Sequence, residues 1–149
     1  MSAPSSTVTE VDRHLAAQVV LARYAAALDE HDLAALEALH DVAATWTFTT
    51  AGQPALALIE GRTAILDFVR GAPRTPEERQ RHVVTNVDVL PGGGDEGEVE
   101  ARGYLVLMSV VSGSVTIVGT GTIRLRLVRD ADRWRILALA VEFDSAPAA

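Results

Sequence analysis

RHVVTNVDVL, residues 81–90, is the stretch at which the pattern of the chain changes from helices to strands. Valine and threonine dominate the stretch, which is typical of a β-strand. His82 and Asn86 are four residues apart, so their side chains share one face of a regular strand. The valines at positions 83, 87 and 89 occupy the opposite, more apolar face. We therefore expect both faces to be covered, one by helices and one by a second copy of the chain.

Three more strand patterns follow, at residues 98–111, 114–128 and 133–143. Ser112 and Gly113 form a tight hairpin signal, because a glycine at that position can take a positive φ. Gly119 and Gly121 lie inside a strand, where glycine indicates a bend or the close approach of another backbone. These features predict a long antiparallel meander in the second half of the chain.

The first half of the chain carries helical patterns. A helix is predicted over residues 10–29, where Thr9 and Asp12 form a variant of the capping box. Asp32 is a good N-cap for a short second helix. A third helix is predicted over residues 62–70. Between them, the alternation of residues 45–50 predicts a strand, and residues 55–60 are a candidate for its short antiparallel return.

The first helix is apolar on nearly every side, which predicts burial on most of its surface. One stripe is formed by apolar residues at positions 11, 15, 19, 22 and 26. Asp29 falls on that stripe, which is an unusual place for a carboxylate. This position makes Asp29 a candidate functional residue.

Helices followed by an antiparallel meander predict an α+β fold, with a long curved sheet wrapped around the first helix. A chain of 149 residues fits one domain. We place this domain at residues 10–144, between flexible tails at residues 1–9 and 145–149.

The composition argues against several classes of function. A net charge of −7 disfavours a nucleic-acid partner, because phosphate binding needs a basic surface. The absence of cysteine excludes disulfides and thiolate metal sites. No apolar run approaches the roughly 20 residues of a membrane helix, and the first residues lack a signal-peptide pattern. We therefore expect a cytoplasmic protein with no membrane partner.

Short motifs carry a resemblance to a known family. They are YAAALDEHD at residues 24–32, GRTAI at 61–65, RHVVTN at 81–86 and DRWRI at 132–136. With the order of the elements, they resemble the SnoaL-like branch of the nuclear-transport-factor-2-like fold. The resemblance implies a cone-shaped α+β fold with a deep apolar pocket and a homodimer formed through the sheet.

Members of this branch differ in function, so the fold does not decide the reaction. They include enzymes similar to scytalone dehydratase and ketosteroid isomerase, polyketide cyclases, and proteins without known activity. In the dehydratase-like members, an aspartate at the end of the first helix and two strand histidines form the acid–base set. By motif, Asp29 matches the aspartate and His82 matches the first histidine. The second histidine would fall near Met108 or Ser109 and is missing, so the dehydratase reaction itself is in question.

Asp29 and His82 are the candidate catalytic pair. A free imidazole titrates near about 6.5, and a nearby carboxylate fixes its tautomer. Such a pair can remove or return a proton on the carbon next to a carbonyl group, or it can assist the loss of water. The alternative is structural: a strand histidine satisfied by its neighbours, and an aspartate that ends or caps a helix.

Further residues are candidates for binding a substrate. They are Asn86, Tyr24, Trp46, Phe48, Tyr104 and Met108. The alternative for the aromatic residues and Met108 is packing in the core, and for Asn86 a hydrogen bond to nearby backbone. His14, His31 and His40 are expected at the surface. Their spacing from neighbouring aspartates gives no closed ligand set, so no metal site is expected.

Two main functions fit these observations. The first is a cofactor-independent isomerase, dehydratase or cyclase that acts on a hydrophobic, ring-bearing substrate. The second is a non-catalytic small-molecule-binding or interaction module of the same fold. A third possibility is a supporting subunit, like the β subunits of ring-hydroxylating dioxygenases.

Overall fold

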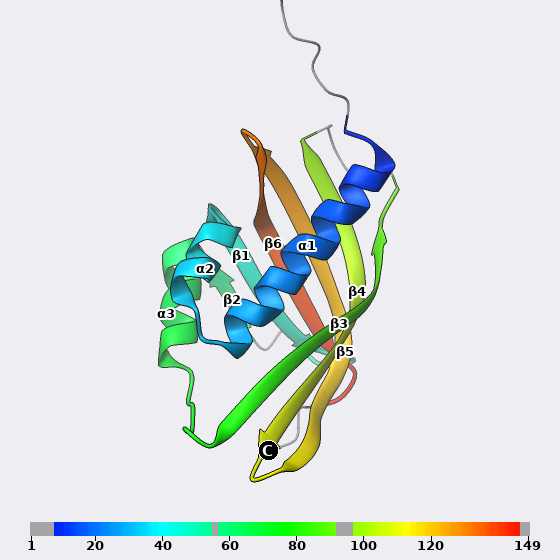
Figure 1. Cartoon of the computed structure of the whole chain (residues 1–149). Coiled ribbons are helices and arrows are strands. Elements are labelled where there is room, and N and C mark those ends of the chain that lie inside the picture. The colour runs from blue at the N-terminus through cyan, green and yellow to red at the C-terminus, as the bar shows by residue number, and fades with distance from the viewer. Residues whose placement is uncertain (1–7, 55–56, 92–96, 147–149) are drawn as a thin grey trace, which may run out of the picture.

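The computed structural model describes residues 8–54, 57–91 and 97–146 and has the predicted α+β architecture (Figure 1). Its elements are α1 (Glu10–Asp29), α2 (Leu33–Leu39), β1 (His40–Thr50), β2 (Ala57–Glu60), α3 (Arg62–Gly71), β3 (Glu78–Val89), β4 (Glu98–Val111), β5 (Ser114–Asp130) and β6 (Arg133–Phe143). Most of the predicted tail residues, 1–7 and 147–149, lie outside the described residues, as do residues 55–56 of the predicted short strand. Among the helices of the described ranges, none combines the length and apolar character that a membrane-spanning segment requires.

The strands form one curved sheet with the order β2-β1-β6-β5-β4-β3. Neighbouring strands are antiparallel except β1 and β6, which run parallel. The sheet does not close, so β2 and β3 are its edges. Figure 1 shows α1 crossing one face of the sheet, with α2 and α3 beside it near β1 and β2. The predicted meander of long strands is therefore confirmed.

The first helix has the predicted bounds and cap, but its buried face differs from the prediction. Asp12 accepts from the Thr9 backbone N–H at 2.9 Å, and Thr9 Oγ1 accepts from the Asp12 N–H at 3.1 Å. The predicted apolar stripe lies outside, because Val11 is 75% and Leu15 60% exposed. The buried residues are Ala16, Ala17, Val20, Leu21, Tyr24, Ala25 and Ala27. The stripe prediction was wrong because the apolar residues of α1 are spread around most of the helix, so periodicity does not single out one buried face.

The core lies between the helices and the concave face of the sheet. On β5, Ile123, Leu125 and Leu127 are buried against it, while the intervening arginines are exposed. Gly121 leaves no room for a side chain, because the Glu142 carbonyl group lies against the place a Cβ would occupy. The close backbone approach predicted for this glycine is therefore confirmed.

A β-bulge in β3 changes which residues of this strand face the core. Between the pairs Thr85–Tyr104 and Asp88–Arg102, two residues of β3 oppose one residue of β4. Asn86 adopts a left-handed φ of 55° there. Gly103 lies opposite, where a Cβ would come within 2.9 Å of the Thr85 carbonyl oxygen.

The bulge brings His82 and Val87, which alternation placed on opposite faces, to the same side of the sheet. Before it, His82 and Val84 face the concave side; after it, Val87 does so. Asn86 therefore lies exposed on the opposite side from His82, and the expectation that they share a face was wrong. A bulge inserts one residue and so exchanges the two faces, which strict alternation cannot anticipate.

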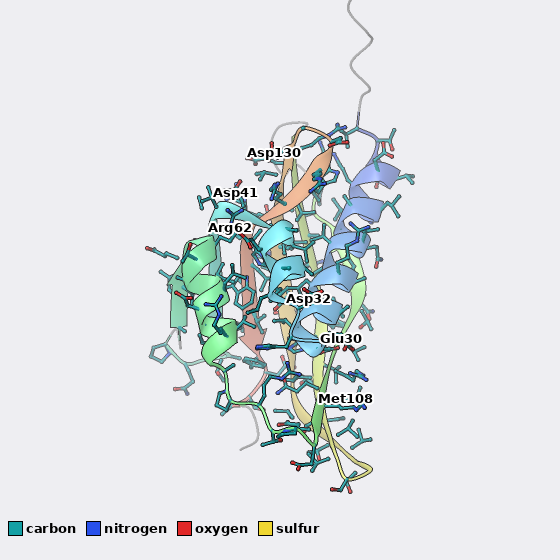
Figure 2. All side chains as sticks on the ribbon, turned by 60° about the vertical axis from the view of Figure 1, so that its left-hand side comes forward. Glu30, Asp32, Asp41, Arg62, Met108 and Asp130 are labelled. Carbon is teal, nitrogen blue, oxygen red and sulfur yellow. The ribbon has the colours of Figure 1, made fainter. Side chains whose placement is uncertain are left out.

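The opposite side of the sheet, hereafter the outer face, carries no helix from the described residues (Figure 1). Tyr104, Val115 and Ile117 on this face are 56%, 63% and 60% exposed. Figure 2 shows Met108 and Asp130 near opposite ends of the sheet. The outer face is therefore the candidate for the sheet face that we expected a second copy of the chain to cover.

The bulge predicts a specific pattern of tolerance at Asn86. Asn86→Gly is expected to change the free energy of unfolding little, because glycine adopts a left-handed φ readily. Asn86→Val is expected to destabilise the fold by about 1–2 kcal/mol, because a β-branched residue is strained at that φ. Urea unfolding measures both. Thr85→Val, at the exposed neighbouring position, is the control and should remain close to wild type. Equal stability of the glycine and valine variants would contradict the bulge.

Candidate active site

A cavity of about 240 Å³ lies between α1, α3 and the concave face of the sheet. Its apolar wall includes Trp46, Phe48, Phe68, Leu105, Leu107 and Phe143. Its polar groups are Tyr24, His31, Arg74, Gln80 and His82. A second hollow of about 670 Å³ lies between α1, α2 and Trp134, but holds neither His82 nor Asp29. The smaller cavity is the candidate site because it combines an apolar wall with the predicted histidine.

Asp29 and His82 are in direct contact, although 53 positions separate them in the chain. The His82 Nδ1 lies 2.7 Å from the Asp29 Oδ1. The backbone N–H of His82 also donates to Asp29, at 3.1 and 3.2 Å from its two oxygens. Because β3 is an edge strand, this N–H would otherwise lack a strand partner on that side. The carboxylate on the last residue of α1 thus holds both the edge strand and its imidazole.

This contact assigns the tautomer of His82. An ionised carboxylate only accepts hydrogen bonds, so the proton of the neutral ring lies on Nδ1. The lone pair is then on Nε2. The side chains of His82 and Asp29 are 14% and 10% exposed, and His82 lines the cavity while Asp29 lies behind it. The arrangement can therefore present a basic nitrogen to a bound molecule.

Tyr24 provides a hydrogen-bond donor in the same cavity. Its side chain is buried in α1, and its ring packs edge-on against Trp46 at 5.9 Å between centroids. Its hydroxyl has no hydrogen-bond partner among the described residues. Burial raises the pKa of Tyr24 above its ordinary value of 10.0, and the charge of Asp29 raises this pKa further. The hydroxyl therefore stays protonated and can donate to an oxygen of a ligand.

His40 is buried, and its predicted surface position was wrong. The residue ends α2 and begins β1, so the chain turns inward there. Its Nδ1 lies 2.6 Å from the Leu36 carbonyl oxygen, and its Nε2 accepts from Trp46 Nε1 at 2.9 Å. Both ring nitrogens are occupied, so His40 positions Trp46 on the cavity wall. Burial lowers the pKa of His40; the Leu36 hydrogen bond opposes this effect, and Arg62 adds to it.

The aromatic wall comes from two strand positions and one helix position. Trp46 and Phe48 alternate on β1, as predicted, and lie edge to face with centroids 6.0 Å apart. Phe68 of α3 stacks on Phe48 at 5.9 Å with 28° between the ring planes. Phe68 is 49% exposed, so it closes the cavity at the surface.

Three predicted binding residues lie outside the cavity. Asn86 and Tyr104 border a separate hollow on the outer face. Met108 alternates with Leu107, and it is Leu107 that lines the cavity. The sequence misled here because Val106 and Met108 are as apolar as Leu105 and Leu107, so alternation does not identify the face that lines the cavity. Leu107 also pairs with His82 across the strands, so a leucine occupies the cavity position beside the imidazole.

Other lining residues were not predicted. Gln80 alternates with His82 on β3, and this spacing could have identified it. His31 and Phe68 carried no distinguishing signal. Arg74 comes from the loop between α3 and β3, whose path the sequence does not reveal. Among the described residues, no group of three or more histidine, aspartate or glutamate side chains could hold a metal ion.

The chain belongs to the SnoaL-like domain family, whose model matches residues 9–140. This match confirms the family suggested by the sequence motifs. No curated protein sequence matches the chain.

Solved structures share the fold at low sequence identity. A putative aromatic ring hydroxylase from Novosphingobium aromaticivorans has 21% identity and a TM-score of 0.76, with 94% of each chain covered. Aln2 from a Streptomyces species has 23% identity and a TM-score of 0.76, covering 92% of this chain and 94% of its own. The β subunit of benzoate 1,2-dioxygenase from Burkholderia mallei has 19% identity and a TM-score of 0.75, with 93% of each chain covered. These similarities establish the fold.

The buried His40 predicts a pH dependence of stability. Because the pKa of His40 is lowered in the folded state, the unfolded chain binds this proton first as the pH falls. The contribution of the neutral His40 to the free energy of unfolding is complete above about pH 6.5. It decreases below that pH, by at most about 1.4 kcal/mol per pH unit. His40→Gln is expected to be less stable than wild type at pH 7.5. Its free energy of unfolding is expected to fall less than that of wild type between pH 7.5 and 5.5.

Urea unfolding at the two pH values measures the effect. His14→Gln, at a half-exposed histidine of α1, is the matched control and should keep the wild-type slope. An unchanged slope in His40→Gln would show that His40 does not titrate as described.

Proposed function

We propose that this protein is a cofactor-independent enzyme that transfers protons on a small, hydrophobic, ring-bearing substrate. One observation carries the proposal: Asp29 binds His82 Nδ1 at 2.7 Å, which leaves Nε2 without a partner among the described residues, and His82 lines an apolar cavity. A base in such a place is positioned for general acid–base catalysis. Membership of the SnoaL-like family supports a substrate of small-molecule size.

The proposed reaction begins with proton abstraction next to a carbonyl group of the substrate. His82 Nε2 takes the proton, and the electron pair of the C–H bond moves to the carbonyl oxygen. The Asp29 carboxylate stabilises the imidazolium that forms. The Tyr24 hydroxyl donates to the developing enolate oxygen.

The imidazolium then returns its proton, and the site of return decides the product. Return to the far carbon of a double bond conjugated with the enolate gives an isomer. Return to a hydroxyl group on the β-carbon releases water, because the enolate electron pair re-forms the carbonyl group while the α,β double bond forms and the C–O bond breaks. In both cases His82 is regenerated, and no other reactant is required.

A generic proton-abstraction substrate tests the pair without knowledge of the natural substrate. 5-Nitrobenzisoxazole is a compact bicyclic compound whose ring opens when a base removes one proton, with a change in absorbance. The wild-type protein is expected to accelerate this opening. Asp29→Asn and His82→Ala are each expected to reduce the acceleration by about a hundredfold, the range of one general base.

Two controls make the result interpretable. Asp29→Asn keeps an oxygen that can accept from the His82 N–H, and thermal unfolding checks that both variants fold. His14→Ala removes a histidine outside the cavity and should leave the rate unchanged. Equal rates in wild type and both site variants would remove the catalytic proposal. The remaining alternative would then be a non-catalytic binding or interaction module.

The protein is further proposed to be a homodimer formed through the outer face. The support is the exposed apolar surface of Tyr104, Val115 and Ile117, which no described helix covers. Burying such a surface against a second copy would remove it from water.

Light scattering after size exclusion tests the dimer. The wild-type mass is expected to be that of two 15.8 kDa chains, and Ile117→Asp is expected to shift it toward one. Leu15→Asp, at a 60% exposed position on α1, is the control and should remain dimeric. A wild-type monomer would refute the dimer. A stable homodimer would also argue against an obligatory larger partner, such as the one a dioxygenase β subunit serves.

A further inference from the structure

The size of the cavity limits its ligand. An apolar cavity of about 150 Å³ holds a benzene molecule, whereas sites for drug-sized ligands start at about 300 Å³. At about 240 Å³, this cavity lies between these limits. The stacked pair of Phe48 and Phe68, with Trp46 edge-on to Phe48, forms flat walls suited to an aromatic ring. One ring, or two fused rings with a small substituent, matches this space.

The charge of the cavity limits its ligand in a second way. Among the described residues that line it, Arg74 is the only one with a permanent formal charge. No lining residue is a carboxylate, since Asp29 lies behind His82. The protein as a whole carries a net charge of −7, so a cationic cavity residue runs against the overall charge.

The guanidinium of Arg74 is free to bind a ligand. It has no ion pair or hydrogen bond with another described residue, whereas Arg70 at the end of α3 is held by Asp67 at 2.6 Å. Arg74 is exposed and follows Ala72 and Pro73, which also line the cavity, so it lies at the mouth. A guanidinium in this position matches a carboxylate in two parallel hydrogen bonds.

We infer that the cavity takes a one-ring or compact two-ring aromatic carboxylate, with the ring against the aromatic side chains and the carboxylate on Arg74. This inference rests on the proposed function for the identity of the site and names its substrate class. It gives His82 and Arg74 separate roles, since His82 moves the proton and Arg74 selects and orients the molecule.

Binding of matched probes tests the inference without turnover. Benzoate and benzamide have nearly the same shape but differ in charge, and 9-anthracenecarboxylate keeps the charge on three fused rings. Isothermal titration calorimetry is expected to show benzoate binding about tenfold more tightly than benzamide, which corresponds to about 1.4 kcal/mol. It is also expected to show 9-anthracenecarboxylate binding at least about tenfold more weakly than benzoate, because the cavity is too small.

Variants assign the preference to Arg74. Arg74→Gln is expected to bring benzoate to the affinity of benzamide and to leave benzamide within about twofold of wild type. Arg79→Gln is the matched control, because Arg79 is exposed on β3 and does not line the cavity, whereas its neighbour Gln80 does. It should keep the tenfold preference. Quenching of Trp46 fluorescence in a Trp134→Phe background places the bound ligand in this cavity.

The outcomes separate this inference from the proposed function. Equal affinities for benzoate and benzamide, no effect of Arg74→Gln, or tight binding of 9-anthracenecarboxylate would overturn the substrate class. None of these results depends on catalysis, and His82→Ala is expected to keep the benzoate preference. If that preference holds while 5-nitrobenzisoxazole opens at the uncatalysed rate, the substrate class stands and the catalytic role of His82 falls.

Discussion

The contact between Asp29 and His82 joins the end of α1 to the edge of the sheet, and the site depends on it. One carboxylate accepts from the imidazole Nδ1 and from the backbone N–H of the same residue. The backbone bond satisfies an exposed strand edge, and the side-chain bond orients the ring. A structural and a proposed chemical role therefore rest on the same atoms. This explains why a carboxylate lies among the apolar residues of the last turn of α1.

The bulge at Asn86 makes this arrangement compatible with a buried strand. It lets His82 face the cavity while Val87, five positions later, still packs against the core. In a regular strand these two side chains would lie on opposite faces. The left-handed φ of Asn86 and the missing side chain of Gly103 provide the space for the extra residue. The local strain is thus placed on the outer face, away from the cavity.

Two histidines of the same chain are used in opposite ways. His40 has both ring nitrogens occupied, by the Leu36 carbonyl oxygen and the Trp46 indole. Such a ring is a fixed part of the wall, and burial disfavours its charged form. His82 lines the cavity and has only its Nδ1 bound, so its Nε2 has no partner among the described residues. The hydrogen bonds around each ring, and not the residue type, distinguish the packing role of His40 from the chemical role proposed for His82.

Local patterns in the sequence were enough to predict the element types, the bounds of α1, β4 and β6 and the α+β class, whereas the pairing of Asp29 with His82 came from the family resemblance. Capping, alternation and turn signals act over a few residues, and the family motifs identified the pair. The buried face of each element, in contrast, was settled by the packing of the whole chain. Val11 and Leu15 of the predicted stripe are exposed, Leu107 and not Met108 lines the cavity, and His40 is buried and not at the surface. Local patterns cannot choose between two apolar faces, because the choice depends on the curvature of the sheet, a bulge and contacts between distant segments.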